Sequence, residues 1–77
     1  MSGKTYPATS YVPVTKANTD FALGTCRSLL VGTAGTANLM QADGTVRADV
    51  PLQRGYNYIE ARQVRTGGTA DDIWALY

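Results

Sequence analysis

The chain has 77 residues, a formal net charge of +1, one cysteine and no histidine. This length allows one small domain, and the single cysteine excludes a disulfide within the chain. The near-neutral charge argues against a basic nucleic-acid-binding surface, and the missing histidine argues against a zinc site. Because small domains usually need a stabilising device besides their core, we expect association between subunits to supply it.

The sequence predicts neither a membrane protein nor a disordered one. No stretch reaches the ~18 apolar residues of a membrane span, and the first residues, MSGKTYPATS, lack the apolar core of a signal peptide. A hydrophobic content of 44% with only 17% charged residues provides enough apolar surface to fold. We therefore expect a protein made in the cytoplasm, with no membrane partner.

Residues 1–19 differ from the rest of the chain, because they contain Pro7 and Pro13 among many serines and threonines. Proline fixes φ and removes a backbone donor, so this stretch is predicted to be an extended N-terminal arm or an edge strand. Two interpretations stay open: a frayed terminus, or an arm that lies on a neighbouring subunit. The strongly apolar residues of the stretch are Tyr11, Val12 and Val14.

From residue 20 onward the apolar pattern has a period of two, as expected for strands with one buried face. Turn signals such as Asp43-Gly44 and Arg54-Gly55 separate the strands, and Pro51 is expected to end one of them. The predicted strands are 26–31, 37–41, 46–50, 56–64 and 72–77. This spacing predicts an all-β fold for residues 20–77: a small antiparallel β-sandwich or barrel, jelly-roll-like, in a single domain.

The last predicted strand is apolar on both faces, with Ile73, Trp74, Leu76 and Tyr77 in six residues. An apolar strand of this kind would promote aggregation if it lay at an open sheet edge. We therefore expect it to be central in a sheet or covered by another subunit.

The stretch Val31 to Thr36, VGTAGT, contains two glycines after an apolar run. A phosphate-binding loop needs a Lys and a Ser or Thr after its glycines, followed by a helix, and no Lys follows Lys16 in this chain. We interpret Gly32 and Gly35 as turn glycines with positive φ in a four-residue hairpin loop. The other predicted turn glycines are Gly44 and Gly55.

No residue pattern indicates catalysis, so we expect no enzyme, no cofactor and no metal. The commonest proton shuttle, histidine, is missing. Cys26 is predicted to be a buried structural thiol, because its neighbour Arg27 would point to the opposite face of a strand. The acidic residues are interpreted as solvated turn carboxylates: Asp20, Asp43, Asp49, Glu60, Asp71 and Asp72.

Aromatic and arginine residues near the predicted strand 56–64 allow two interpretations. They suit a small OB-like β-barrel that binds single-stranded nucleic acid, using Tyr56, Tyr58, Arg54, Arg62 and Arg65. Glu60 lies in the middle of the same face and weakens this interpretation. The alternative is a structural face or a subunit interface rich in Tyr and Arg. The candidate interface residues over the whole chain are Tyr11, Val12, Val14, Tyr56, Tyr58, Arg62, Trp74 and Tyr77.

Five segments occur in an order that resembles the small spike-base proteins of phage-like gene transfer agents and their relatives in tailed phages. They are VTKANTDF, CRSLLVGTAG, DGT, VPLQRG and TGGTADDIWALY. Those proteins share a C-R-x-L-x-V-G-T-A-G block, a V-P-x-x-G turn and a T-x-x-T-A-x-x-I-x-A-L-Y ending. The resemblance covers about residues 14 to 77.

The resemblance implies a non-enzymatic virion protein, a capsid spike-base or decoration subunit on the surface of a bacteriophage or phage-like particle. It implies a symmetric homo-oligomer, for which we favour a pentamer at a capsid vertex with a trimer as the alternative. The implied partners are the major capsid protein or a spike or fibre protein, with no nucleic acid. The family contributes no catalytic residues. It implies turn roles for Gly32 and Gly35, core positions for Leu29 and Val31, and a closing strand at Ile73, Ala75 and Tyr77.

Overall fold

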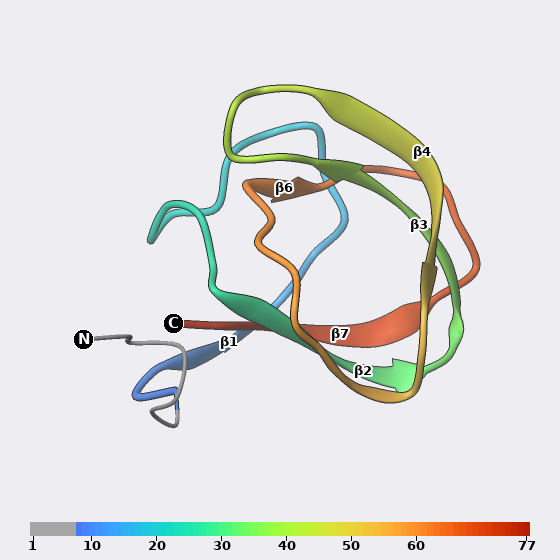
Figure 1. Cartoon of the computed structure of the whole chain (residues 1–77), viewed down its shortest axis with the longest axis horizontal. Coiled ribbons are helices and arrows are strands. Elements are labelled where there is room, and N and C mark those ends of the chain that lie inside the picture. Colours follow the sequence, from blue (N-terminus) through green and yellow to red (C-terminus); the bar gives the residue numbers. More distant parts are fainter. Residues whose placement is uncertain (1–7) are drawn as a thin grey trace.

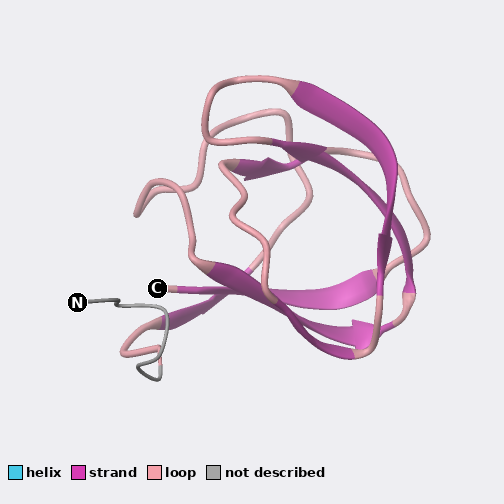
Figure 2. Cartoon of the chain, viewed as in Figure 1, coloured by secondary structure: helices cyan, strands magenta, loops and turns pink. Residues whose placement is uncertain are grey.

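The computed structural model describes residues 8–77, which form seven strands in two antiparallel sheets and no helix (Figures 1 and 2). The strands are β1 Tyr11–Pro13, β2 Ser28–Thr33, β3 Gly35–Met40, β4 Val46–Leu52, β5 Gly55–Asn57, β6 Gln63–Val64 and β7 Asp71–Leu76. The first sheet has the order β1-β7-β2-β5 and the second β4-β3-β6. The predicted all-β fold is confirmed as a small sandwich-like pair of sheets, and the described strands close no barrel.

The core lies between the two sheets, which form the lower and upper layers in Figure 1. Alternate residues of β2, β3 and β7 point inward, as the pleat of a β-strand requires. Leu29 and Val31 of β2 meet Ala37 and Leu39 of β3, and all four are buried. The remaining members of the buried cluster are Cys26, Leu52, Ala61, Val64, Ala70, Ile73 and Ala75.

Strand β7 is central in its sheet, between β1 and β2. Its full length therefore has backbone partners, which answers the aggregation hazard that an apolar terminal strand would pose at an open edge. Residues 8–19 run along the same chain rather than away from it: β1 pairs with β7, and the N–H of Ala17 donates to the carbonyl of Val64. The part of the predicted arm that precedes residue 8 lies outside the described residues.

The predicted strand 56–64 is wrong, because the chain changes sheets within it. Residues 55–57 form β5 in the first sheet, and only residues 63–64 form β6 in the second. Pro51 likewise does not end its strand, since β4 continues to Leu52 and Pro51 pairs with Thr36. β4 lies at an edge of its sheet, where the missing N–H of a proline is tolerated.

The predicted hairpin at VGTAGT is also wrong. β2 and β3 belong to different sheets, so Ala34 between them is a corner at which the chain passes from one sheet to the other. Positive φ angles occur at Gly44 (91°) and Gly55 (99°) but at neither Gly32 nor Gly35.

Close packing explains the two corner glycines. An added Cβ at Gly32 would lie 2.8 Å from the carboxyl carbon of Asp72, and one at Gly35 would lie 2.6 Å from the backbone nitrogen of Ala70. Both distances are shorter than carbon atoms tolerate. Glycine is therefore required here because another segment approaches the backbone closely, which is a different reason from turn geometry.

Candidate interaction surface

The outer face of the four-stranded sheet carries a row of apolar side chains. The pairing register aligns Pro13 of β1 with Trp74 of β7, Trp74 with Leu30 of β2, and Leu30 with Tyr56 of β5. Residues in one register row point to the same side of a sheet. Since the neighbouring Leu29 points into the core, this row faces away from it and crosses all four strands.

The side chains of this row are accessible to solvent to different degrees. Leu30 and Trp74, on the two central strands, are half-buried and do not belong to the core cluster. The ring of Tyr56 is stacked on that of Tyr58, with centroids 6.0 Å apart and planes inclined by 9°. Tyr58 is 81% exposed, so the free side of the pair faces water. We call the set Tyr11, Pro13, Leu30, Tyr56, Tyr58 and Trp74 the aromatic face.

Four of the candidate interface residues lie on one face of the four-stranded sheet. Tyr11, Tyr56, Tyr58 and Trp74 lie on the aromatic face, where Tyr11 shares the outer side of β1 with Pro13. Sequence reasoning missed Pro13 and Leu30. The signal for Leu30 was its position next to Leu29 in an alternating strand. Assigning Leu30 to the outer face, however, requires knowing which face of the sheet the second sheet covers.

The other four candidates lie elsewhere. Val14 and Tyr77 pack against the core cluster. Val12 points to the same side of its sheet as the buried Ala75 and remains 38% exposed at the sheet edge. Arg62 lies beside β6 in the other sheet, and its guanidinium is engaged with Asp20.

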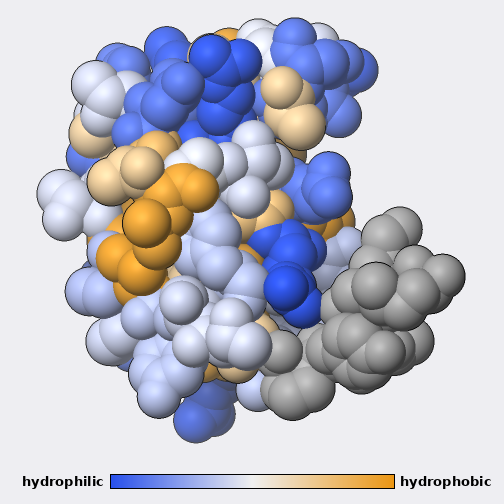
Figure 3. Space-filling view, turned by 90° about the vertical axis from the view of Figure 1, so that its left-hand side faces the viewer, coloured by the Kyte–Doolittle hydropathy of each residue, from blue (hydrophilic) through white to orange (hydrophobic). Residues whose placement is uncertain are grey.

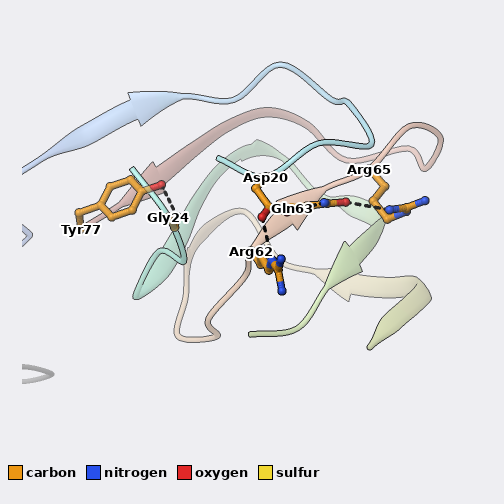
Figure 4. A network of polar contacts seen from close by, with 6 residues as sticks. All are labelled: Asp20, Gly24, Arg62, Gln63, Arg65 and Tyr77. Atoms are coloured by element: carbon orange, nitrogen blue, oxygen red, sulfur yellow. Dashed lines mark hydrogen bonds and ion pairs between the residues drawn. The ribbon is translucent and has the colours of Figure 1, made fainter. Parts of the chain in front are cut away.

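A polar network joins the segment before β2 to strand β6 (Figure 4). Asp20 accepts hydrogen bonds from Nε of Arg62 at 3.0 Å and from Nε2 of Gln63 at 2.6 Å. These bonds from Gln63 and Arg62 lower the pKa of the Asp20 carboxyl below its usual value. Gln63 is buried and also accepts from Arg65 at 2.7 Å. The network therefore fastens one chain segment to another, and its carboxylate stays ionised.

Two further groups near the C-terminus are structural. The hydroxyl of Tyr77 donates to the carbonyl of Gly24 at 2.8 Å (Figure 4), and burial raises the pKa of this phenol. Burial also raises the pKa of the Cys26 thiol, which is completely inaccessible to solvent. A buried thiol with a raised pKa is a poor nucleophile, in agreement with the structural role predicted for Cys26.

Polar groups elsewhere on the surface stabilise turns. The carboxylate of Asp43 accepts from the N–H of Thr45 at 2.9 Å, and this bond lowers the pKa of Asp43. Beside this turn lies an open hollow lined by residues 41–43 with Ile59 and Glu60. Within residues 8–77 no three Cys, Asp or Glu side chains are grouped so that they could hold a metal ion.

Exposed apolar side chains also occur outside the aromatic face, among them Val12 and Ile59, each 38% exposed. Leu23 and Val46 are 61% and 47% exposed, the first in a loop and the second on β4. The side of the molecule drawn in Figure 3 is mostly hydrophilic, with one compact apolar patch. Residues 8–77 include no helix of the length and hydropathy that a bilayer crossing requires.

No family model, curated protein or solved structure matches this chain. Stacked tyrosines, a tryptophan, a leucine and a proline offer apolar contact area with few polar atoms. Such a surface suits association with another protein, because aromatic residues supply large contact area at low entropic cost.

Proposed function

We propose that this chain is a non-enzymatic structural subunit of a phage or phage-like particle. It acts as a spike-base or decoration subunit on the particle surface, assembled as a symmetric homo-oligomer. A pentamer is favoured, and a trimer is the alternative. Its partners are the major capsid protein or a spike or fibre protein that the ring carries.

The observation that carries this proposal is the aromatic face. An apolar row crosses all four strands of one sheet, and Tyr11 and Tyr58 on that face are 68% and 81% exposed. Contiguous exposed apolar surface commonly marks a protein–protein interaction site. A domain of 77 residues without a disulfide also gains stability from burying such a surface against a second subunit.

The segments that resemble the spike-base proteins add support. The block CRSLLVGTAG contains β2 and the corner at Ala34, and the ending TGGTADDIWALY contains β7. β2 and β7 pair with each other along most of their length. The two longest resembling segments thus build the centre of the sheet that carries the aromatic face.

Light scattering behind size exclusion, over a range of concentrations, tests the proposal. A closed species of five or three subunits supports it and identifies the symmetry. A chain that remains an 8.2 kDa monomer at micromolar concentration overturns it.

The stacked pair Tyr56 and Tyr58 also suits base stacking, so single-strand nucleic-acid binding is the alternative function. Arg54 adjoins β5, but the placement of the other two candidate arginines argues against it. Arg62 and Arg65 flank β6 in the other sheet, whereas the tyrosines belong to the first sheet. Retention on single-stranded DNA that falls steeply with salt would favour the alternative. Unchanged elution on that matrix at low salt would exclude it.

A further inference from the structure

The exposed apolar side chains gather at two opposite edges of one sheet. Residues 8–77 include seven large apolar side chains that are exposed. Four of them belong to the edges of the four-stranded sheet: Tyr11 and Val12 on β1, Tyr56 on β5, and Tyr58 just after it. The central strands β2 and β7 contribute none of the seven. We call the two groups the β1 edge and the β5 edge.

The β1 edge is poorly suited to further strand pairing. The N–H of Val14 donates to β7 and the carbonyl of Ser10 accepts from it, so the backbone groups of Tyr11 and Pro13 point away from β7. Pro13 has no N–H to offer there. A proline at an edge strand is a recognised protection against pairing with another chain. The exposed Tyr11 and Val12 side chains are therefore better placed to contact a partner by side-chain packing than by extending the sheet.

The β5 edge is protected from strand pairing in a different way, by side chains of the same chain. Nε2 of Gln53 donates to the carbonyl of Tyr56 at 2.8 Å. The side chain of Asn57 in turn bonds both backbone groups of Gln53, accepting from its N–H at 3.0 Å and donating to its carbonyl at 2.9 Å. These contacts occupy the outward carbonyl of β5 with groups of the same chain. Here too apolar side chains remain exposed, while a backbone carbonyl that strand pairing would need is already engaged.

We propose that the β1 edge of one copy packs against the β5 edge of the next copy, in a head-to-tail contact made by side chains. This inference rests on the proposed function and names the two surfaces that build the ring. A two-fold contact between two β5 edges would leave Tyr11 and Val12 exposed on both copies, and a contact between two β1 edges would leave the tyrosine pair exposed. Among contacts made between edges, the head-to-tail contact is the one that covers both groups with a single kind of interface.

Topology allows this contact to close. In the antiparallel order β1-β7-β2-β5 the two edge strands run in opposite directions. A rotation about an axis along the strands therefore places each β5 beside an antiparallel β1 of the neighbour. Head-to-tail contacts of one kind produce closed rings when the rotation divides a full turn.

Two single variants, studied apart and mixed, test the arrangement. Tyr11→Lys places a charge at the β1 edge and Tyr58→Lys places one at the β5 edge. Each should raise the concentration at half-assembly by about tenfold or more. Mixed in equal amounts, they should form a one-to-one heterodimer, because each variant retains the edge that the other has lost. Val46→Thr, at an exposed β4 position, is the matched control and should assemble like the unmodified chain.

The outcomes separate this inference from the proposed function. Unmodified chains that stay monomeric overturn both. Rings that form normally in both Lys variants overturn the edge arrangement and leave the structural role standing. A Tyr11→Lys chain that still forms stable dimers points to two-fold β5 contact and also overturns it. Thermal unfolding of each variant checks the fold, and Tyr11→Ser and Tyr58→Ser replace the Lys variants if these unfold.

Discussion

The two faces of the four-stranded sheet differ in the side chains they carry and in what covers them. Its inner face is aliphatic, with Leu29 and Ala75 buried against the second sheet. Its outer face carries aromatic rings, with Tyr56 53% exposed and Trp74 half-buried. Both faces are apolar, so hydropathy alone does not show which of them is buried. The inner face stabilises the subunit, whereas part of the outer face stays accessible to solvent, and this is the area that the proposed association would bury.

Leu29 and Leu30 offer the sharpest test of this difference, because they are the same residue type on opposite faces of β2. Leu29→Ala should lower the free energy of unfolding by about 2–5 kcal/mol, since it leaves a cavity in a fully buried site. Leu30→Ala should cost about 1 kcal/mol or less, since the half-buried side chain leaves no enclosed cavity. Urea unfolding measures both. Equal losses would contradict the assignment of the two faces.

The corner at Ala34 allows the second sheet to cover the inner face, and Gly35 tests it. Gly35→Val should cost about 1–3 kcal/mol, because its Cβ would meet the backbone of Ala70, which cannot move aside. Gly55→Ala is the comparison, because its φ is +99° but no atom lies within 4 Å of the added Cβ. The Ala variant should report backbone strain alone, about 1 kcal/mol. A Gly35→Val protein as stable as the unmodified chain would mean that the corner has room.

Two Tyr→Phe substitutions compare a hydroxyl group that makes a hydrogen bond with one on the exposed aromatic face. Tyr77→Phe removes the bond to the carbonyl of Gly24 and should cost about 1 kcal/mol. Tyr56→Phe removes a hydroxyl from the exposed aromatic face and should change the stability of the isolated subunit by less than about 0.5 kcal/mol. Thermal unfolding at low protein concentration measures both. A larger loss for Tyr56→Phe would indicate a bond on the outer face.

The smallest effect on stability is expected at low pH. It comes from carboxyl groups in loops rather than from either face of the sheet. Hydrogen bonds lower the pKa values of Asp20 and Asp43 below their ordinary value of 3.8. Their contribution to stability is therefore complete above about pH 4 and is lost as the pH falls through the lowered values. Asp20→Asn combined with Asp43→Asn should flatten the stability profile below pH 4. An unchanged acid limb would show that other groups control it.

The sequence by itself determined much of the local structure. The alternating residues 46–50 predict a strand, and β4 forms there, but the buried face expected from the alternation is wrong, because Val46 and Ala48 are exposed. The dipeptide Asp43-Gly44 predicts a turn because Gly tolerates the φ of +91° found there. The buried state of Cys26 also followed from local pattern. Tyr11, Tyr56, Tyr58 and Trp74 of the aromatic face could be selected from their type and position.

Only the tertiary structure decided which strands pair and which faces are covered. An alternating pattern is the same whichever neighbour a strand takes, so residues 56–64 read as one strand although the chain crosses between sheets within them. Gly32 and Gly35 carry no local sign that Asp72 and Ala70 approach them from a distant segment. The sequence pattern around Leu30 would be the same whether its side chain faced inward or outward. Its outward position follows only from the sheet that covers Leu29. Long-range pairing creates these contacts, and no local propensity encodes them.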